Sequence, residues 1–332
     1  MAARLRTVSA ALLVAASIAG CGSSDDDSKG SDSAAAPKAV PAAPAISFPS
    51  VAGKKGIEEV LADAVTGGPE LAPSVSELAP GPNRFGFGLF DNDSGEMPAE
   101  DQVAIYIAKA DGTGAKGPYT ARRESLEVPP AFRSQQTAND ATPFVWVTTV
   151  PFSKPGDYGA IAVVRRGGEL LASSPVQIKV GKKGSGPPNV GDMAPKISTK
   201  TPADVGGDIS KLTTRRPPIR SLVDTNIAKV QGSKPVVLGF ATPQLCQTRV
   251  CGPVVDIMAQ LQARYGEQVA FIQQEVYLDD NPSKGLRPQL VAYDLKTEPW
   301  TYVIDRTGRI AARFEGAFSA EELEAAVRGV AP

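Results

Sequence analysis

Two kinds of hydrophobic pattern follow one another along the chain. Between residues 57 and 180, short apolar runs are separated by Gly, Pro, Asn and Asp, and the last run, Val176–Val180, alternates strictly between apolar and polar positions. Such alternation is typical of a half-buried strand. We therefore expect an all-β sandwich here, after one short helix near 57–65. The expected strands lie at 85–90, 103–107, 144–147, 158–164 and 176–180.

After residue 190 the apolar runs alternate with helical periodicity. Apolar residues from Val254 to Tyr265 recur at helical spacing, which predicts an amphipathic helix over 251–265. Ser319-Ala-Glu-Glu322 has the form of a capping box and should begin a final helix. The pattern therefore predicts an α/β domain. Its expected strands lie at 234–240, 269–272, 300–304 and 309–314.

The first residues show a third pattern. Two arginines precede an apolar stretch from about residue 8 to residue 20, and Cys21 follows. This pattern is typical of a signal peptide over 1–20, and the stretch is too short to span a bilayer. Ile18-Ala-Gly-Cys21 resembles a bacterial lipobox, which implies cleavage before Cys21 and lipidation of its sulfur and amino group. The alternative is an ordinary signal peptide followed by an unrelated cysteine.

Composition completes the predicted organisation. Residues 21–46 are rich in Ser, Asp, Ala and Pro, which predicts a disordered, lipid-anchored tether. Gly, Pro and Lys over 181–189 indicate a linker. We thus expect a protein outside the cytoplasm, anchored to the bacterial cell membrane through Cys21. Its expected parts are a signal peptide (1–20), the tether (21–46), the β-sandwich domain (57–180), the linker (181–189) and the α/β domain (190–332).

Charge and histidine content exclude several functions. The chain has 35 Lys and Arg residues and 36 Asp and Glu residues. It therefore has no excess of basic charge that would favour binding to nucleic acid. It has no histidine, which removes histidine bases and nearly all histidine metal sites. We predict no metal site and no cofactor.

The candidate chemistry lies in Cys246 and Cys251. Both follow the apolar run Pro235–Phe240 and stand at the beginning of the predicted helix. Amide groups at a helix N-terminus favour the reactive thiolate over the thiol. If Cys21 carries lipid, Cys246 and Cys251 are the two cysteines that remain. In an oxidising compartment they are expected to form a disulfide at least part of the time.

Three segments resemble parts of the thioredoxin superfamily, and in particular TlpA-type thiol–disulfide oxidoreductases. They are Val190–Pro195, the strand Val236–Thr242 before the cysteines, and the Pro-x-Thr…Ile-Asp-x-x-Gly pattern within Glu298–Gly308. The resemblance implies a thioredoxin-like fold with a central mixed sheet over 190–332. It also implies a cis Glu298–Pro299 bond facing the cysteines. In the first domain, Lys154-Pro-Gly-Asp-Tyr158 resembles the tyrosine corner of immunoglobulin-like domains.

The spacing of the two cysteines resembles that of a different protein family. Four residues separate Cys246 from Cys251, whereas TlpA-type proteins have two, and Val254 stands where their second cysteine would be. Four intervening residues with Thr-Pro before them resemble Q-type peroxiredoxins. Q-type peroxiredoxins carry an arginine just before the strand that corresponds to the expected strand 300–304. At that place this chain has Glu298-Pro299-Trp300.

Three functions follow from these patterns. The first is a thiol–disulfide oxidoreductase in which Cys246 attacks and Cys251 resolves, acting on protein thiols and disulfides together with a redox partner protein. Pro299, Trp300 and Thr242 would then contact the substrate, with Trp300 as an apolar lip. The second is a thiol peroxidase of the peroxiredoxin type. The third is a non-enzymatic binding module in which Cys246–Cys251 is a structural disulfide.

Overall fold

The computed structural model describes residues 47–98, 102–140, 142–246 and 248–332. Residues Ser47–Pro332 form one compact unit. The signal peptide over 1–20, the tether over 21–46 and the lipidated Cys21 lie outside the described residues, so they stay predictions.

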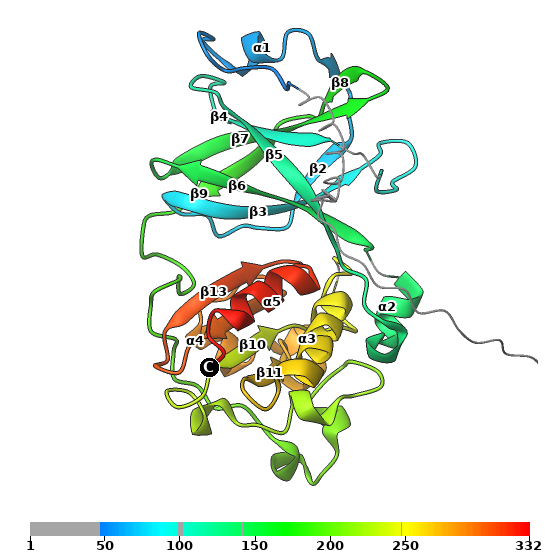
Figure 1. Cartoon of the computed structure of the whole chain (residues 1–332), viewed down its shortest axis with the longest axis vertical. Coiled ribbons are helices and arrows are strands. Elements are labelled where there is room, and N and C mark those ends of the chain that lie inside the picture. Colours follow the sequence, from blue (N-terminus) through cyan, green and yellow to red (C-terminus); the bar gives the residue numbers. More distant parts are fainter. Residues whose placement is uncertain (1–46, 99–101, 141, 247) are drawn as a thin grey trace, which may run out of the picture. The chain divides into compact units, whose positions relative to one another are not determined.

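The first half of this unit is built of β-strands, as predicted. One short helix, α1 (Ile57–Val60), precedes the strands, and the sheet order within the described residues is β1-β8-β7-β4-β5-β6-β3-β2, with β9 paired to β7 (Figure 1). The strands are β1 (Val65–Thr66), β2 (Glu70–Pro73), β3 (Gly81–Phe90), β4 (Val103–Lys109), β5 (Lys116–Ser125), β6 (Phe144–Phe152), β7 (Gly156–Arg166), β8 (Glu169–Ala172) and β9 (Val176–Val180).

Strand β5 connects the two halves of this sheet. Its first residues pair with β4 and its last, Arg122–Ser125, pair with β6. Side chains from both halves, including Phe85, Trp146 and Ile105, share one buried core, so the halves pack as a sandwich. The Tyr158 hydroxyl donates a hydrogen bond of 2.9 Å to the Lys154 carbonyl. The all-β prediction is confirmed, and the immunoglobulin-like topology stays a prediction.

The second half is an α/β arrangement around a four-stranded sheet in the order β11-β10-β12-β13. Strands β10 and β11 are parallel and the other neighbours are antiparallel, which confirms the predicted mixed sheet. The capping box of α5 is present, because the Glu322 amide donates to the Ser319 hydroxyl at 3.1 Å. The elements are β10 (Val236–Phe240), α3 (Cys251–Tyr265), β11 (Ala270–Gln274), α4 (Pro288–Ala292), β12 (Trp300–Ile304), β13 (Ile310–Glu315) and α5 (Ala320–Arg328).

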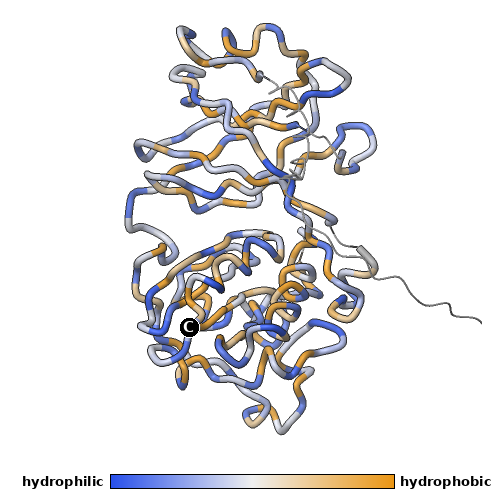
Figure 2. The backbone as a smooth tube through the Cα atoms, in the orientation of Figure 1, coloured by the Kyte–Doolittle hydropathy of each residue, from blue (hydrophilic) through white to orange (hydrophobic). Residues whose placement is uncertain are grey.

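Helices α3 and α5 share one buried core with one face of this sheet. The opposite face packs against α4 and the 3-10 turn that contains Ile227. Hydrophobic stretches, orange in Figure 2, recur along the strands of both sheets. The 3-10 turns are Pro130–Phe132, Pro202–Val205, Ile209–Lys211, Arg220–Leu222, Ile227–Lys229, Leu278–Asp280 and Pro282–Lys284.

Helix α3 is more deeply buried than an amphipathic helix should be. Every residue from 251 to 259 is buried, including the charged Asp256. The cause is the connection between β5 and β6, which contains the short helix α2 (Gln135–Asp140) and packs Leu126 and Val128 into the same core as α3. A helix that is covered on several sides does not need a polar face. The amphipathic prediction therefore fails for residues 251–259, which a distant segment helps to cover, and holds near the C-terminal end, where Leu261 is buried and Ala263 and Arg264 are exposed.

Asp256 is stabilised inside this core by partners from two other segments. Its Oδ1 accepts a hydrogen bond from Arg215 Nε at 2.8 Å, in an ion pair whose side chains are 3% and 0% exposed. Its Oδ2 accepts hydrogen bonds from the Ser134 amide at 2.8 Å and from the Ser134 hydroxyl at 2.9 Å. A buried charge needs such compensation. The three segments are thereby joined beneath the N-terminal end of α3.

Candidate functional site

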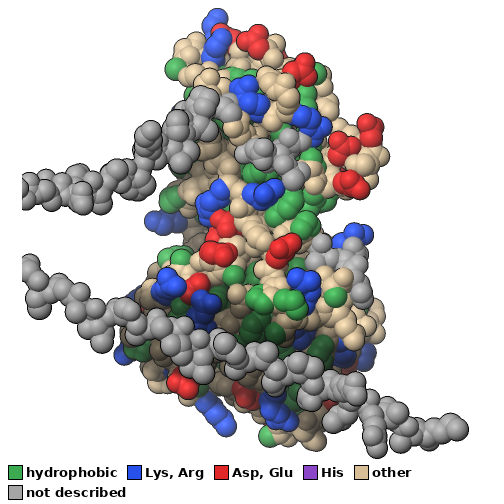
Figure 3. Space-filling view, turned by 45° about the vertical axis from the view of Figure 1, so that its right-hand side comes forward, with side chains coloured by type: hydrophobic (Ala, Val, Ile, Leu, Met, Phe, Trp, Pro, Cys, Tyr) green, Lys and Arg blue, Asp and Glu red, His purple; other side chains and the backbone are tan. Residues whose placement is uncertain are grey.

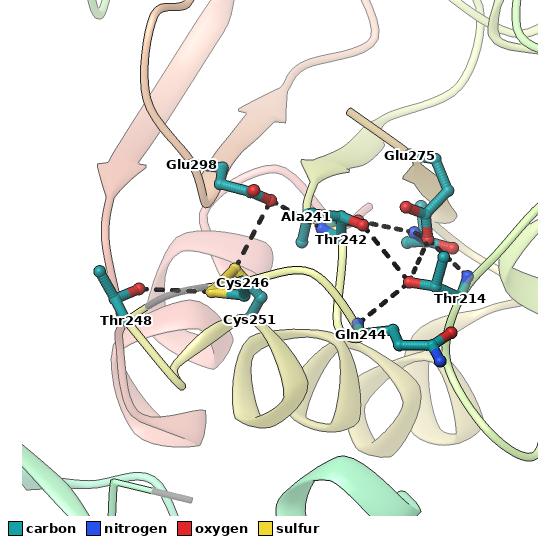
Figure 4. Close-up of a disulfide and its surroundings, with 10 residues drawn as sticks. Thr214, Ala241, Thr242, Gln244, Cys246, Thr248, Cys251, Glu275 and Glu298 are labelled. Atoms are coloured by element: carbon teal, nitrogen blue, oxygen red, sulfur yellow. Dashed lines mark hydrogen bonds between the residues drawn. A yellow bond between two sulfur atoms is a disulfide. The ribbon is translucent and has the colours of Figure 1, made fainter. Parts of the chain in front are cut away.

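A disulfide joins Cys246 and Cys251, with 6.0 Å between their Cα atoms (Figure 4). Cys246 lies in the loop after β10, and Cys251 is the first residue of α3. The expected pairing is therefore confirmed. Cys251 is 0% exposed, whereas Cys246 is partly exposed. A substrate can thus approach Cys246 and cannot reach Cys251 directly.

Each sulfur lies near a group that can stabilise negative charge. Cys246 Sγ lies 3.3 Å from the Thr248 hydroxyl oxygen, and a hydroxyl can donate a hydrogen bond to a thiolate. Cys251 is at the N-terminus of a helix of 15 residues, where the amide groups and the helix dipole stabilise negative charge.

The carboxyl group of Glu298 lies beside the buried sulfur. Its Oε2 atom is 3.7 Å from Cys251 Sγ and accepts a hydrogen bond from the Thr242 amide at 2.9 Å. Burial raises the pKa of Glu298 to about 7, although the Thr242 amide opposes this shift. The neighbouring Glu275 raises this pKa further, and a hydrogen bond with Tyr277 lowers it. Near neutral pH this carboxyl can therefore both accept and release a proton.

Near the half-buried Glu298 lies a second carboxyl, Glu275, which is fully buried. It accepts hydrogen bonds from the Thr214 amide at 2.6 Å and from the Thr214 hydroxyl at 3.0 Å. The Thr214 and Thr242 hydroxyl oxygens are 3.4 Å apart, so the network extends from Glu275 to the residue that binds Glu298 (Figure 4). Burial raises the pKa of Glu275 as well.

Two of the predicted substrate contacts need correction. Trp300 is 0% exposed, because alternation along β12 places it with Tyr302 on the face of the sheet that α4 covers, where the two rings stack with centroids 5.9 Å apart. It cannot form an exposed lip. Thr242 is also 0% exposed and orients Glu298 through its amide. The Glu298–Pro299 bond is cis, as expected, and Pro299 lines a cleft beside the cysteine loop.

The sequence interpretation missed both carboxyl groups. Glu298 directly precedes the proline that was expected to face the cysteines, so its position was a usable signal. Glu275 carries no such signal, because Gln273-Gln274-Glu275 reads as a polar strand end and its contact with Thr214 spans 61 residues.

The described residues lack two other features. No group of three His, Cys, Asp or Glu side chains there is placed to hold a metal ion. Within the same ranges, no helix has the length and apolar character needed to cross a membrane. Figure 3 shows acidic, basic and hydrophobic side chains interspersed over the visible face, with no broad patch of one charge.

Comparison with known proteins gives distant similarity in structure only. No protein-family model matches the chain, and no curated protein matches it. A Chlorobium tepidum protein described as thiol:disulfide interchange protein DsbE is similar, at 19% identity and a TM-score of 0.30, over 43% of this chain and 97% of its own. A second interchange protein of the thioredoxin family from Chlorobium tepidum TLS has 14% identity and a TM-score of 0.30, over 43% of this chain and 98% of its own. A Bacteroides thetaiotaomicron protein described as a protein disulfide isomerase has 16% identity and a TM-score of 0.29, over 43% of this chain and 87% of its own.

Proposed function

We propose that this protein is a thiol–disulfide oxidoreductase that exchanges disulfides with protein thiols through Cys246 and Cys251. One observation carries the proposal: the disulfide has one partly exposed sulfur and one buried sulfur, and the buried one lies 3.7 Å from a carboxyl whose pKa is about 7. This arrangement separates an attacking thiol from a resolving thiol and provides the latter with a base.

The exchange proceeds in two steps that balance. In the reduced protein, the Cys246 thiolate attacks a substrate disulfide; a Cys246–substrate disulfide forms, and the other substrate sulfur leaves as a thiolate and takes up a proton. Cys251 then attacks the Cys246 sulfur, forms the Cys246–Cys251 disulfide and releases the second substrate thiolate. Two electrons pass from the protein to the substrate, and the reverse sequence oxidises a substrate dithiol.

Glu298 acts as the base in the second step and accepts the proton of the Cys251 thiol. The Cys251 thiol must lose its proton before it attacks, and an unperturbed cysteine has a pKa of about 8.5. A carboxylate of ordinary pKa would be a weak base toward that thiol, whereas one with a pKa of about 7 is closely matched to it. The released substrate thiolate can then recover the proton from Glu298.

The location and the partners belong to the same proposal. The lipobox-like segment before Cys21 supports a lipid anchor outside the cytoplasm, and the composition of 21–46 supports a tether. A redox partner protein would restore the starting state of the cysteines. The hydrogen bond between Tyr158 and Lys154 supports the immunoglobulin-like assignment of 57–180.

The pH profile of the resolving step should depend on Glu298. In the wild type, the rate at which Cys251 resolves the mixed disulfide should rise through pH 7, because Glu298 becomes a carboxylate as the pH passes its raised pKa. In Glu298→Gln the rise near pH 7 should disappear, and the rate should increase only where the Cys251 thiol ionises by itself. Single-turnover kinetics from pH 5 to pH 10 measure both profiles.

The control for this change is Glu267→Gln, an exposed carboxylate that follows α3. It should retain the wild-type profile. An unchanged rise near pH 7 in Glu298→Gln would assign the base to another group.

The reduction potential of the cysteine pair tests the proposed function itself. The full-length chain would be equilibrated in glutathione buffers of defined potential, and its free thiols would be alkylated and counted by mass spectrometry. We expect a midpoint between about −120 and −270 mV, the range of proteins that exchange disulfides. A midpoint below about −300 mV would instead indicate a structural bond and would contradict the proposal.

A further inference from the structure

A large cleft borders the cysteine loop, with a volume of about 710 Å³. Thr248, Arg249 and Val250, which lie between the two cysteines, form part of its wall together with Glu298 and Pro299. The facing wall comes from the β-sandwich and includes Pro73, Phe90, Met97 and Phe144. Strands far from the cysteines in sequence therefore form half of a cleft at the redox site.

Specific contacts fix this second wall. Arg84 of β3 donates hydrogen bonds to both carboxyl oxygens of Glu322, at 3.0 and 2.7 Å, and to the Ala317 carbonyl at 2.8 Å. Ala317 itself lines the large cleft. Val145 and Val250 line it from opposite walls and belong to one buried core. The β-sandwich wall is thus packed against the α/β region.

The other side of the cysteine loop is bordered in a similar way. A small hollow of about 230 Å³ is lined by Cys246, Gln244 and Gly252, and by Gln136 from the β5–β6 connection. The β5–β6 connection lies close to the beginning of α3 here, since a Cβ atom on Gly252 would lie only 3.0 Å from the Thr137 hydroxyl oxygen. A macromolecule that reaches Cys246 therefore meets residues of the N-terminal half on both sides.

The chemistry of the large cleft indicates its ligand. Its volume is within the range of ligand-binding clefts, and its walls contain two phenylalanines, three prolines and a methionine. Aromatic and methionine side chains are typical of surfaces that bind apolar groups of a partner. Among the described residues, only Glu96, Arg249 and Glu298 supply charges to the lining, and they are of mixed sign, which does not favour a strongly charged ligand.

Strand β2 adds a backbone feature to this wall. It pairs with β3 and ends the sheet order, so its other edge has no strand partner within the described residues. Ala72 and Pro73 at its end line the large cleft. An outer strand can add an extended peptide as a further strand.

We propose that the large cleft binds an extended segment of the substrate polypeptide, with an apolar side chain next to the reacting cysteine. This inference rests on the proposed function and extends it, because the N-terminal half then selects the substrate. Continuity of the cleft with the cysteine loop supports this occupant, since a segment bound along the exposed Thr248 and Arg249 would bring its own cysteine toward Cys246.

The test compares two disulfide substrates with the full-length chain. One is a short synthetic peptide with a single cysteine between two phenylalanines, joined to thionitrobenzoate; the other is free cysteine joined to thionitrobenzoate. Removal of one aromatic anchor should lower the rate with the peptide about tenfold. We expect this loss in Phe144→Ala, with the rate for the small substrate nearly unchanged.

A second variant and a control keep the result interpretable. Met97→Asp changes a loop residue of the same wall and should give the same selective loss, even if Phe144→Ala is poorly folded. Val65→Ser changes a residue of β1 that is 52% exposed and outside the lining, and should leave both rates unchanged. Equal losses for both substrates, or no loss for either, would overturn the proposal.

A binding measurement separates this proposal from the proposed function. The same peptide with serine in place of cysteine is titrated into the Cys246→Ser, Cys251→Ser chain. Binding that Met97→Asp weakens supports the cleft even if the protein has no exchange activity. Two results would assign the cleft to another occupant: dimerisation that depends on Phe144 without peptide binding, or peptide binding only after removal of residues 1–46.

Discussion

Replacement of Cys246 by serine is expected to reduce thiol–disulfide exchange to the uncatalysed background. A serine hydroxyl does not ionise near neutral pH and cannot form a disulfide, so the attacking group is lost. Cys251 cannot replace it, because its side chain is 0% exposed. Reduction of insulin disulfides in the presence of dithiothreitol, measured against a reaction without protein, gives the activity.

Replacement of Cys251 is expected to give a different product with a similar loss of turnover. In Cys251→Ser the Cys246 thiol still attacks, but no internal thiol releases the substrate, so the mixed disulfide should accumulate. A non-reducing gel or intact-mass measurement should detect this adduct, which Cys246→Ser should not form. If Cys246→Ser instead trapped substrate and Cys251→Ser did not, the assigned order of attack would be wrong.

The elements with the clearest hydrophobic pattern were the most predictable. The helix over 251–265 and the strand over 300–304 have the predicted bounds, because apolar residues recur there with the period of a helix or form a continuous buried run. Strand β5 was not predicted. Its sequence is mostly polar, and its formation depends on pairing with β4 and β6 rather than on its own pattern.

The site was only partly predictable, for a physical reason. The disulfide and the cis Glu298–Pro299 bond followed from local motifs. The raised pKa of Glu298 depends on its burial, and its neighbours Thr242 and Glu275 are distant in sequence. Likewise, Trp300 was expected at the surface because it is next to Pro299, yet both faces of β12 are covered, so every side chain of this strand is buried.

The connection between β5 and β6 links the two halves more tightly than the sequence indicated. It covers α3, lines the small hollow and binds Asp256 through Ser134. Since α3 begins at Cys251, the residues that hold this helix also hold this cysteine. The stability of the fold and the geometry of the cysteine pair should therefore depend on the same buried ion pair.

Replacement of Asp256 by alanine is expected to lower the free energy of unfolding by about 3–5 kcal/mol, since it leaves the Arg215 guanidinium as a buried charge without its carboxylate. The two side chains are 3% and 0% exposed, so water cannot compensate. The Ser134 amide would also lose its acceptor. Urea unfolding followed by circular dichroism measures the change. The exposed Lys54–Glu59 pair is the control, and Glu59→Ala should cost less than about 1 kcal/mol.

A double replacement distinguishes an uncompensated charge from a simple loss of packing. In Asp256→Leu with Arg215→Met no charge stays buried, so the double variant should recover much of the stability that Asp256→Ala loses. If the double variant were no more stable than Asp256→Ala, the loss would instead arise from the broken hydrogen bonds to Ser134 and Phe132 that join α3 to the β5–β6 connection. In that case the ion pair would act mainly by holding this connection against the helix that carries Cys251.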